Sequence, residues 1–461
     1  MNDRIAVKQL DPGQSSDKIY VRSVEGFYQR IRAVTLWALM GMYFGFCWIN
    51  INGQQMIHFD LPARQFHLFG ATFWPQDFYL LAFLLIICAF GLFFITTLVG
   101  RIWCGYTCPQ TAWTFIFMWL EEKVEGSRNQ RMKLDRKGFE GQRVRKKITK
   151  HLLWLFVAFW TGVTFVGYFY PIRELVPDMF TLNLTQFWAW FWIGFFTLAT
   201  YLNAGWMREK VCLYMCPYAR FQSVMFDQDT LTVTYDFNRG EPRGSRKKGA
   251  SREETGLGDC IDCGICVQVC PTGIDIRDGL QYECINCGLC VDACDEVMER
   301  MDYEPGLIRY ATEREMSEGR SRFLKPRTLG YGLGLIAVVV AVSMAITSRP
   351  EVTLDVSGDR GGLYQTGQGN LIENSYSVRI SNRSDQTRVF TLGISGIEGI
   401  RTLEQHEVEL AGGEDRRIPV VVQVSSGELG QSTTPIEFRV ESVNEPGVQA
   451  NSTSTFIGPS R

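Results

Sequence analysis

The sequence predicts a multi-domain membrane protein with an α-helical bundle, a small cysteine-rich α+β insert and an all-β C-terminal domain. Three observations support this prediction. Long apolar runs alternate with charged stretches, eight of the fourteen cysteines lie between residues 260 and 294, and short alternating segments without cysteine follow residue 350. A chain of 461 residues has room for two or three domains. The net charge of −2 gives no indication of a nucleic-acid partner.

Five apolar segments are long enough to cross a bilayer, which needs about 20 residues. They are residues 33–51, 78–100, 152–170, 185–203 and 329–347. The first segment is long, starts late and has no small-residue cleavage site, so we do not expect a cleavable signal peptide. The apolar segment 109–120 is too short to span and should lie in the membrane interface or pack against the bundle.

Basic residues between these segments predict the orientation. The segment 101–150 contains twelve Lys and Arg residues, whereas 52–77 contains only Arg64 and 171–184 only Arg173. Lys and Arg are concentrated in cytoplasmic loops of membrane proteins. The N-terminus should therefore be cytoplasmic and the C-terminal domain should lie outside.

These features divide the chain into five parts. They are a cytoplasmic tail at 1–32, a four-span membrane domain at 33–203 with the cytoplasmic loop 101–150, a cytoplasmic region at 204–328, a fifth transmembrane helix at 329–347 and an external domain at 350–461. Clustered cysteines on the cytoplasmic side indicate metal ligation in a reducing compartment rather than a disulfide scaffold.

Eight cysteines form two runs of equal spacing, CIDCGICVQVCP from Cys260 and CINCGLCVDAC from Cys284. In the spacing Cys-x2-Cys-x2-Cys-x3-Cys, three cysteines bind one [4Fe–4S] cluster and the fourth binds the other. The predicted ligands are Cys260, Cys263, Cys266 and Cys294 for one cluster, and Cys284, Cys287, Cys290 and Cys270 for the second. Zinc, which Cys-x2-Cys pairs also bind, fits two such runs poorly.

This spacing predicts a two-cluster ferredoxin-like insert at about 255–300, with two [4Fe–4S] clusters as cofactors. Gly264 and Gly288 should let backbone amides approach the sulfurs, and Pro271 should end the first run. The second run ends in Cys294-Asp295, where bacterial two-cluster ferredoxins usually have proline. We expect ligation to survive this change and the carboxylate to lower the potential of the cluster that Cys294 serves.

Two further cysteine pairs follow the second and fourth apolar segments. The motif Cys-x3-Cys-Pro occurs with Cys104 and Cys108 and again with Cys212 and Cys216. Proline suits the first position of a helix, so Cys108 and Cys216 should be N-caps with a lowered thiol pKa near the positive end of the helix dipole. This internal repeat should bring four thiols together at the cytoplasmic edge of the membrane.

Three chemistries could use these four thiols. They could hold a third iron–sulfur cluster, bind copper as soft ligands of Cu(I), or act as dithiol/disulfide couples. Their spacing does not distinguish a cluster from copper.

The region from 350 onward has the composition of an antiparallel β domain. Short alternating runs such as SYSVRI, RIPVVVQV and PIEFRVES are separated by turn-rich pieces such as SNRSDQ and GGEDR. This pattern is typical of an immunoglobulin-like (Ig-like) sandwich. It contains no candidate catalytic cluster, so we expect an interaction or docking module.

Over essentially its whole length the chain resembles the FixG/RdxA/CcoG family of cytochrome c oxidase accessory proteins. The motifs that carry the resemblance are GRIWCGYTCPQ at 100–110, VCLYMCPYARFQSVMFDQDTL at 211–231, YDFNRGEPRG at 235–244, the cysteine runs at 260–294 with CDEVMERM, and GLIRY at 306–310. The resemblance implies a bacterial inner-membrane protein, with a periplasmic C-terminal domain, that helps assemble the cbb3-type oxidase with copper chaperones as partners. It also implies reduction of Cu(II) to Cu(I), with Cys104, Cys108, Cys212 and Cys216 as copper-handling thiols.

The leading functional hypothesis is therefore a cupric reductase supplied with electrons by a cytoplasmic donor that the sequence does not name. One alternative is a membrane electron relay between a quinol and a cytoplasmic acceptor, with a third cluster on the two Cys-x3-Cys pairs. Another alternative is a non-enzymatic assembly scaffold that acts through its Ig-like domain.

Overall fold

The computed structural model describes residues 18–459 apart from 52, 137–140, 182–186, 249–255, 323, 349, 359–363, 368–369, 385 and 404–406. Residues 1–17 of the predicted tail, the first two of the fourth predicted span and residue 255 of the predicted insert lie outside this set. The chain forms two compact units, Met1–Val340 and Ala341–Arg461, and the division falls inside one long helix.

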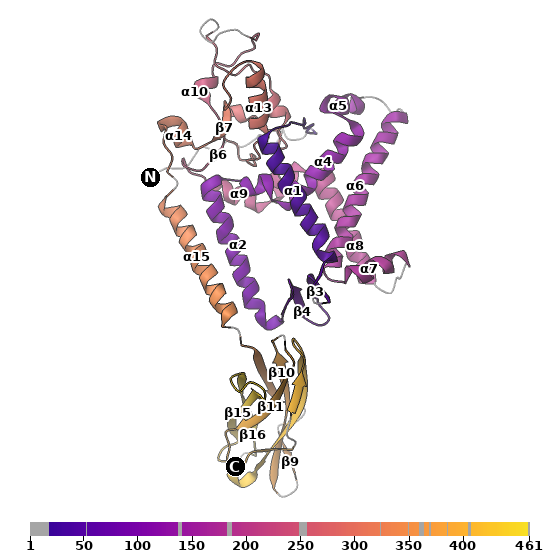
Figure 1. The fold of residues 1–461 in the computed structure, drawn as a ribbon, viewed down its shortest axis with the longest axis vertical. Coiled ribbons are helices and arrows are strands. Elements are labelled where there is room, and N and C mark those ends of the chain that lie inside the picture. The colour runs from indigo at the N-terminus through magenta and orange to yellow at the C-terminus, as the bar shows by residue number, and fades with distance from the viewer. Residues whose placement is uncertain are drawn as a thin grey trace. The chain divides into compact units, whose positions relative to one another are not determined.

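Helices dominate the first unit (Figure 1). They are α1 (Phe27–Gly45), α2 (Phe78–Val99), α3 (Ile102–Tyr106), α4 (Pro109–Glu125), α5 (Arg128–Arg136), α6 (Gly141–Gly167), α7 (Ile172–Phe180), α8 (Phe187–Thr200), α9 (Pro217–Val224), α10 (Phe237–Gly240), α12 (Ile265–Gln268), α13 (Leu289–Arg300), α14 (Glu313–Glu318) and α15 (Pro326–Thr347). Short 3-10 turns lie at Phe46–Trp48, Pro75–Asp77 and Ile276–Asp278, and π-helices at Tyr201–Met207 and Val211–Met215.

Four helices of the described chain are long and apolar enough to cross a membrane. They are Phe27–Trp48, Phe78–Val99, Gly141–Gly167 and Pro326–Thr347. The fourth predicted span, 185–203, is not among them, because α8 has 14 α-helical residues and continues as a π-helix. The prediction of five spans therefore stays a prediction. The segment 109–120, predicted to be too short to span, lies in α4, which is not one of the candidate spans.

Close helix contacts organise this bundle. A Cβ on Gly162 of α6 would lie 2.7 Å from the carbonyl oxygen of Ile193 in α8, so glycine lets the two helices pack closely. A second close contact joins α15 to α2. Gly334 of α15 lies against Phe90 of α2, and Tyr331 of α15 also packs against Phe90. A small three-stranded sheet joins α1 to α2: β3 (Ile57–Asp60), β4 (Gln65–Leu68) and β5 (Ala71–Phe73), preceded by the β1–β2 hairpin (Asn50–Ile51, Gln54–Gln55).

Two strands outside the cysteine runs complete the ferredoxin-like part. β6 (Thr232–Tyr235) pairs antiparallel with β7 (Ile308–Ala311). Together with α12 and α13 they enclose a core that includes Val233, Ile276 and Met298. This domain is therefore wider than the predicted range of 255–300. It lies at the end of the bundle where α1 begins (Figure 1).

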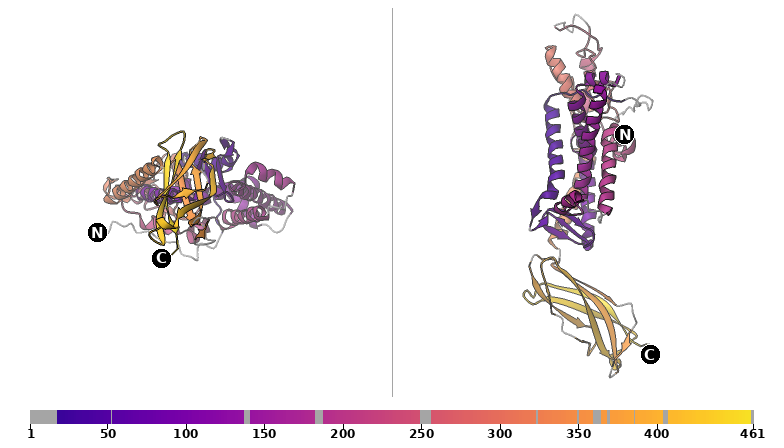
Figure 2. Two further views of the ribbon diagram at one scale, coloured as in Figure 1. Left: turned by 90° about the horizontal axis from the view of Figure 1, so that it is seen from below. Right: turned by 90° about the vertical axis from the view of Figure 1, so that its right-hand side faces the viewer.

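The second unit is an all-β sandwich (Figure 2). Its strands are β8 (Val352–Gly358), β9 (Gln365–Thr366), β10 (Leu371–Asn382), β11 (Arg388–Ser395), β12 (Arg401–Thr402), β13 (Glu407–Leu410), β14 (Asp415–Ser425), β15 (Thr433–Ser442) and β16 (Gln449–Ile457), with a 3-10 turn at Ser426–Glu428. One sheet has the order β12-β14-β10-β8, with β9 on β10, and the other has the order β13-β11-β15-β16. Phe390, Phe438 and Phe456 are fully buried between them. The prediction of an all-β C-terminal domain is confirmed.

Candidate functional site

The two cysteine runs fold as local repeats of each other. Gly264 and Gly288 precede α12 and α13 with φ of 63° and 73°, a left-handed conformation that glycine adopts without strain. Asp262 and Asn286, at equivalent places in the two runs, are also left-handed. Asp and Asn tolerate this conformation better than other residues. The letters CIDCG and CINCG therefore encode the same turn twice.

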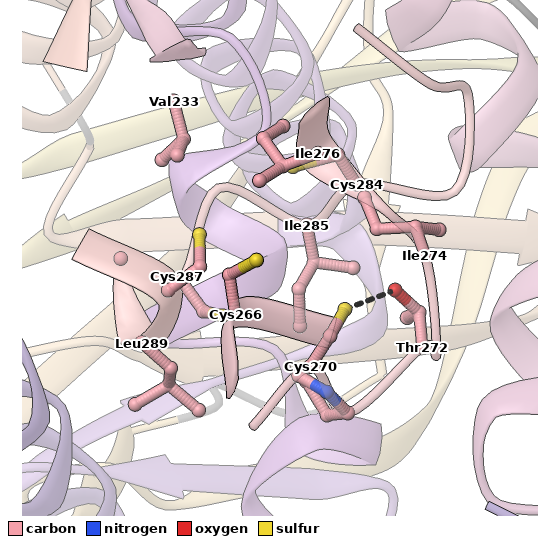
Figure 3. Close-up of a pocket in the computed structure, with 13 residues that line it drawn as sticks. Val233, Cys266, Cys270, Thr272, Ile274, Ile276, Cys284, Ile285, Cys287 and Leu289 are labelled. Atoms are coloured by element: carbon pink, nitrogen blue, oxygen red, sulfur yellow. Dashed lines mark hydrogen bonds between the residues drawn. The ribbon is translucent and has the colours of Figure 1, made fainter. Parts of the chain in front are cut away.

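Two cavities lie inside the ferredoxin-like part, each with about 360 Å³ of empty space. The first cavity is lined by Cys260, Cys263, Cys266 and Cys294. The second cavity is lined by Cys270, Cys284, Cys287 and Cys290. Cys266 lines this cavity as well as the first one (Figure 3). These groups match the two predicted ligand sets, although the assignment of individual ligands stays a prediction.

The walls of both cavities are mainly apolar. Ile265 and Val297 line the first, and Ile274 and Ile276 the second. Burial raises the pKa of the Cys266 thiol to about 12, despite the opposing charge of Arg277. A thiol in such surroundings is neutral unless a cation stabilises the thiolate.

The donor set fits a cubane cluster better than a single ion. Each of the two cavities is lined by the four cysteines of one predicted ligand set. A [4Fe–4S] cubane takes one thiolate at each iron and so needs four thiols spread around a cavity. The two cysteine-lined cavities provide that arrangement.

Asp295 occupies the position at which bacterial two-cluster ferredoxins usually have proline, and it does not disturb the ferredoxin-like part. Its Oδ1 accepts a hydrogen bond of 2.8 Å from the backbone N–H of Gly306. Because proline is absent, α13 continues from Leu289 to Arg300. Burial raises the pKa of the Asp295 carboxyl.

The two Cys-x3-Cys pairs lie at helix ends, as predicted. Cys108 is the N-cap of α4 and Cys216 the N-cap of α9, and neither sulfur accepts a capping hydrogen bond. Cys104 lies in α3 and Cys212 in the π-helix Val211–Met215. Cys212 interacts electrostatically with the other three, and Cys104 with Cys108 and Cys216. The structure thus brings these four residues, the edge thiols, together.

Two of the edge thiols, Cys104 and Cys212, lie in a desolvated environment. Burial raises the pKa of Cys104 although the Arg101 guanidinium opposes it, and burial raises the pKa of Cys212 to about 12. Desolvation outweighs the nearby positive charge. The prediction of a lowered thiol pKa concerned the two helix N-caps, Cys108 and Cys216, and it stays a prediction.

Two polar partners of the edge thiols were missed from the sequence. Arg101 places its Nη2 4.0 Å from Cys104 Sγ and donates from Nη1 to the carbonyl oxygen of Tyr282 at 2.5 Å. The Cys104 thiol donates to Gln222 Oε1 at 3.3 Å, and Gln222 is buried. In the sequence, Arg101 is one of the twelve Lys and Arg residues that indicate orientation. Gln222 lies six residues after Cys216, and no known motif spacing identifies it as a partner of a cysteine.

The edge thiols adjoin the second cavity. Cys104 packs against the apolar cluster that contains Ile285, Cys287 and Leu289. A Cβ on Gly105 would lie 2.7 Å from the carbonyl oxygen of Ile285, so only glycine allows this approach. The Tyr106 hydroxyl donates to the carbonyl oxygen of Cys287 at 3.2 Å. One continuous packed layer therefore joins the two cysteine groups.

A buried ionic cluster fixes the second pair of edge thiols. Arg208, four residues before Cys212, has a left-handed φ of 44° and donates from Nη2 to Glu121 Oε2 of α4 at 2.6 Å. Glu121 also lies 3.3 Å from Lys18 and 4.0 Å from Lys150. Burial alone would raise the pKa of Glu121, but the charges of Arg208, Lys18 and Lys150 lower it to about 2.

Three family descriptions match this chain. A "4Fe-4S binding domain" matches residues 81–125, a "4Fe-4S dicluster domain" matches 207–313, and the "IG-like fold at C-terminal of FixG" matches 342–459. The first range includes Cys104 and Cys108, and the second includes Cys212, Cys216 and the eight ferredoxin-like cysteines.

Protein RdxA of Cereibacter sphaeroides is 38% identical over 397 residues, which cover 83% of each chain. The chain belongs to the FixG/RdxA family. Nitrogen fixation protein FixG of Rhizobium meliloti is 35% identical over 444 residues, 88% of this chain and 84% of FixG. A crystal structure of a FixG-related protein from Vibrio parahaemolyticus is 19% identical, covers 24% of this chain and 97% of its own, and has a TM-score of 0.22.

These findings confirm the resemblance read from the sequence. The FixG-family chain combines iron–sulfur domains, apolar helices of membrane-spanning length and an Ig-like C-terminal domain. It is therefore a membrane iron–sulfur protein. Copper chemistry and a role in oxidase assembly go beyond these findings.

Proposed function

We propose that this protein is an oxidoreductase of the bacterial inner membrane that passes electrons from its ferredoxin-like part to the edge thiols and there reduces Cu(II) to Cu(I). The observation that carries the proposal is the packing of Cys104 against the loop of Cys287. The copper substrate, the cbb3-type oxidase and the copper chaperones are what the resemblance of the sequence motifs to the FixG/RdxA/CcoG family implies, and we carry them into this proposal.

The residues of the chain would divide the work between two places. Cys260, Cys263, Cys266 and Cys294 would hold one [4Fe–4S] cluster, and Cys270, Cys284, Cys287 and Cys290 would hold the other. Clusters of this kind supply one-electron redox chemistry.

The edge thiols would bind the copper substrate, because soft sulfur ligands favour Cu(I) over Cu(II). Arg101 and Gln222 orient Cys104, and Arg208 fixes the segment that carries Cys212. The orientation predicted from Lys and Arg places this chemistry on the cytoplasmic side, with the Ig-like unit in the periplasm as a docking module for assembly partners.

A second candidate is favoured by the family descriptions. Both ranges that contain the edge thiols are described as 4Fe-4S domains. In this candidate the edge thiols hold a third cluster, and the protein relays electrons without binding copper.

Anaerobically purified protein tests the two candidates. We would compare wild type with the double variants Cys104→Ser/Cys108→Ser and Cys212→Ser/Cys216→Ser. The control is Cys88→Ser, at an exposed cysteine of α2. Serine is a good N-cap, so the helix starts should be retained. Each protein is reduced with dithionite and freed of excess reductant by anaerobic gel filtration, and the Cu(I) then formed from added Cu(II) is measured together with iron content.

The copper proposal expects about eight irons per protein in every form, with Cu(I) formation lost in both double variants. The relay candidate expects about twelve irons in wild type and about eight in the double variants. Unchanged Cu(I) formation in both double variants would contradict the copper proposal.

A further inference from the structure

A larger cavity lies on the far side of the second cavity's wall. It is partly open to solvent and has about 600 Å³ of empty space between the N-terminal segment, α1, α4 and the cysteine loops. Pro271 and Leu289 line both this cavity and the second cavity, so these side chains separate the two. Pro271 follows Cys270 and Leu289 precedes Cys290. An occupant of the larger cavity would therefore lie next to a predicted cluster.

Two side chains that line the larger cavity have buried polar atoms without hydrogen-bond partners. Within the described residues, Gln29 Oε1 and Arg131 Nε are buried and make no hydrogen bond, and both side chains line this cavity. Leaving a buried donor or acceptor unpaired costs about 1–3 kcal/mol. Gln29 Oε1 is a hydrogen-bond acceptor and Arg131 Nε is a donor. Such a combination suits a ligand that carries hydroxyl groups.

Aromatic side chains connect this cavity to the membrane. Phe115 and Trp119 of α4 line it. Both contact Trp37 of α1, with ring centroids 6.4 Å and 5.8 Å from it. Trp37 and Trp119 are 47% and 41% exposed, and α1 is a candidate span. Tryptophan concentrates where a membrane meets water, so the cavity is accessible to a lipid-soluble molecule.

We propose that this cavity binds a membrane quinol, the electron donor for the ferredoxin-like part. The inference rests on the proposed electron transfer and adds its source. On oxidation both quinol O–H bonds break and two C=O bonds form. The two electrons would pass to the two [4Fe–4S] clusters that the predicted ligand sets would hold, one electron to each. One proton passes to the carboxylate of Glu122, which lines the cavity and is partly exposed, and the other passes to water.

The charges that line the cavity have both signs, Glu122 against Arg22, Arg32 and Arg131, so a phospholipid headgroup is the competing occupant that the test must exclude. The cavity contains the carboxylate of Glu122, which would repel a phosphate and which accepts a 2.7 Å hydrogen bond from Ser23. Arg32 donates from Nε to the Gly105 carbonyl oxygen at 3.0 Å, and Arg131 lies 3.8 Å from Glu121. Two of the arginines that line the cavity are thus already engaged.

The test uses full-length, anaerobic protein with duroquinol as the probe. Reduction of the clusters is followed by paramagnetic resonance, with dithionite as a reductant that needs no binding site. Gln29→Leu removes the free acceptor, and Met118→Trp narrows the cavity that Met118 lines. Gln142→Leu, at an exposed position of α6, is the matched control. A second readout independent of turnover is labelling by an azidoquinone, located by mass spectrometry.

We expect duroquinol to reduce the wild-type clusters. Gln29→Leu should slow this reduction about three- to tenfold, which is the effect expected from the loss of one hydrogen bond to the ligand. Met118→Trp should slow it more, Gln142→Leu should not, and the azidoquinone should label α4. The proposal is overturned if duroquinol fails where dithionite succeeds, if both cavity variants react at the wild-type rate, or if the label misses α4 and phospholipid copurifies instead.

The same experiment separates this proposal from the proposed function. If duroquinol fails but dithionite-reduced protein still forms Cu(I), only the quinol site is wrong. If duroquinol reduces the clusters and no Cu(I) forms, the quinol site stands and the copper proposal is wrong.

Discussion

The ferredoxin-like cysteines and the edge thiols are positioned by different means. The former follow one another closely in sequence, on turns set by Gly264 and Gly288 and between mainly apolar walls. The edge thiols come from two segments about a hundred residues apart, held together by contacts such as the one between Arg208 and Glu121. Changes outside the cysteine motifs should therefore disturb the edge thiols more than the ferredoxin-like part.

The largest effect should come from Cys290→Ala. Cys290 lines the second cavity, and without its thiolate the predicted cluster loses one ligand. We expect the iron content to fall by about four per protein, roughly half of the total. Iron analysis and paramagnetic resonance measure this loss. Cys88→Ala, an exposed cysteine in α2, is the control and should keep full iron. Full iron in Cys290→Ala would contradict the ligand assignment.

The next effect should come from Glu121→Gln, which should disturb the edge thiols selectively. The substitution leaves Arg208, Lys150 and Arg131 without their shared buried carboxylate. Breaking a buried ion pair in this way costs about 3–5 kcal/mol. We expect Cys212 and Cys216 to react faster with iodoacetamide while the ferredoxin-like iron is retained. Equal loss of iron and of thiol protection would show that the two regions are not independent.

The pH dependence of this effect follows from the pKa of Glu121. Its pKa is about 2 in the folded protein and ordinarily 4.5. A lowered carboxyl pKa stabilises the fold above the ordinary value, and that stabilisation is lost as the pH falls. The stability difference between wild type and Glu121→Gln should therefore be full above about pH 4.5 and shrink towards about pH 2. Denaturant unfolding of both proteins between pH 2 and pH 7 measures this difference.

The difference between the ferredoxin-like cysteines, which lie on local turns, and the edge thiols, which depend on distant contacts, also explains which features could be predicted from the sequence. The cysteine spacing, the apolar runs and the alternating strands are local patterns, and they predicted the ferredoxin-like part, the candidate spans that the structure contains and the β sandwich. β6 and β7 were missed because four-residue strands far from the cysteines carry little signal. Arg101, Gln222 and Glu121 were missed because their roles depend on contacts between distant segments.

A smaller effect should come from Gly105→Ala, which tests the junction between the two regions. The new methyl carbon would lie 2.7 Å from the Ile285 carbonyl oxygen and 3.0 Å from Cys287 Cα, so α3 must move away. Overpacking of this kind costs about 1–3 kcal/mol. We expect slower Cu(I) formation with unchanged iron content. Gly91→Ala in α2, where a methyl group meets nothing within 4 Å, is the control. An unchanged rate would contradict transfer across this junction.

The smallest effect should come from Asp292→Ala, which tests how the ferredoxin-like part holds α1. The Asp292 carboxylate of α13 accepts hydrogen bonds from the backbone N–H groups of Tyr28 and Gln29, at 3.1 Å and 2.7 Å. It thereby caps α1 from another domain and places negative charge at the positive end of the helix. Loss of a capping side chain costs about 1 kcal/mol.

Hydrogen exchange of the Tyr28 and Gln29 amides measures that loss, and about 1 kcal/mol corresponds to roughly fivefold faster exchange. Asp295→Ala, three residues along the same helix, removes the contact with Gly306 instead and should leave these two amides unchanged. Because Gln29 also lines the proposed quinol cavity, Asp292→Ala should weaken duroquinol reduction of the clusters without lowering iron content. If the amides keep their wild-type exchange rates, the ferredoxin-like part does not hold the start of α1, and the cavity between them must be fixed by other contacts.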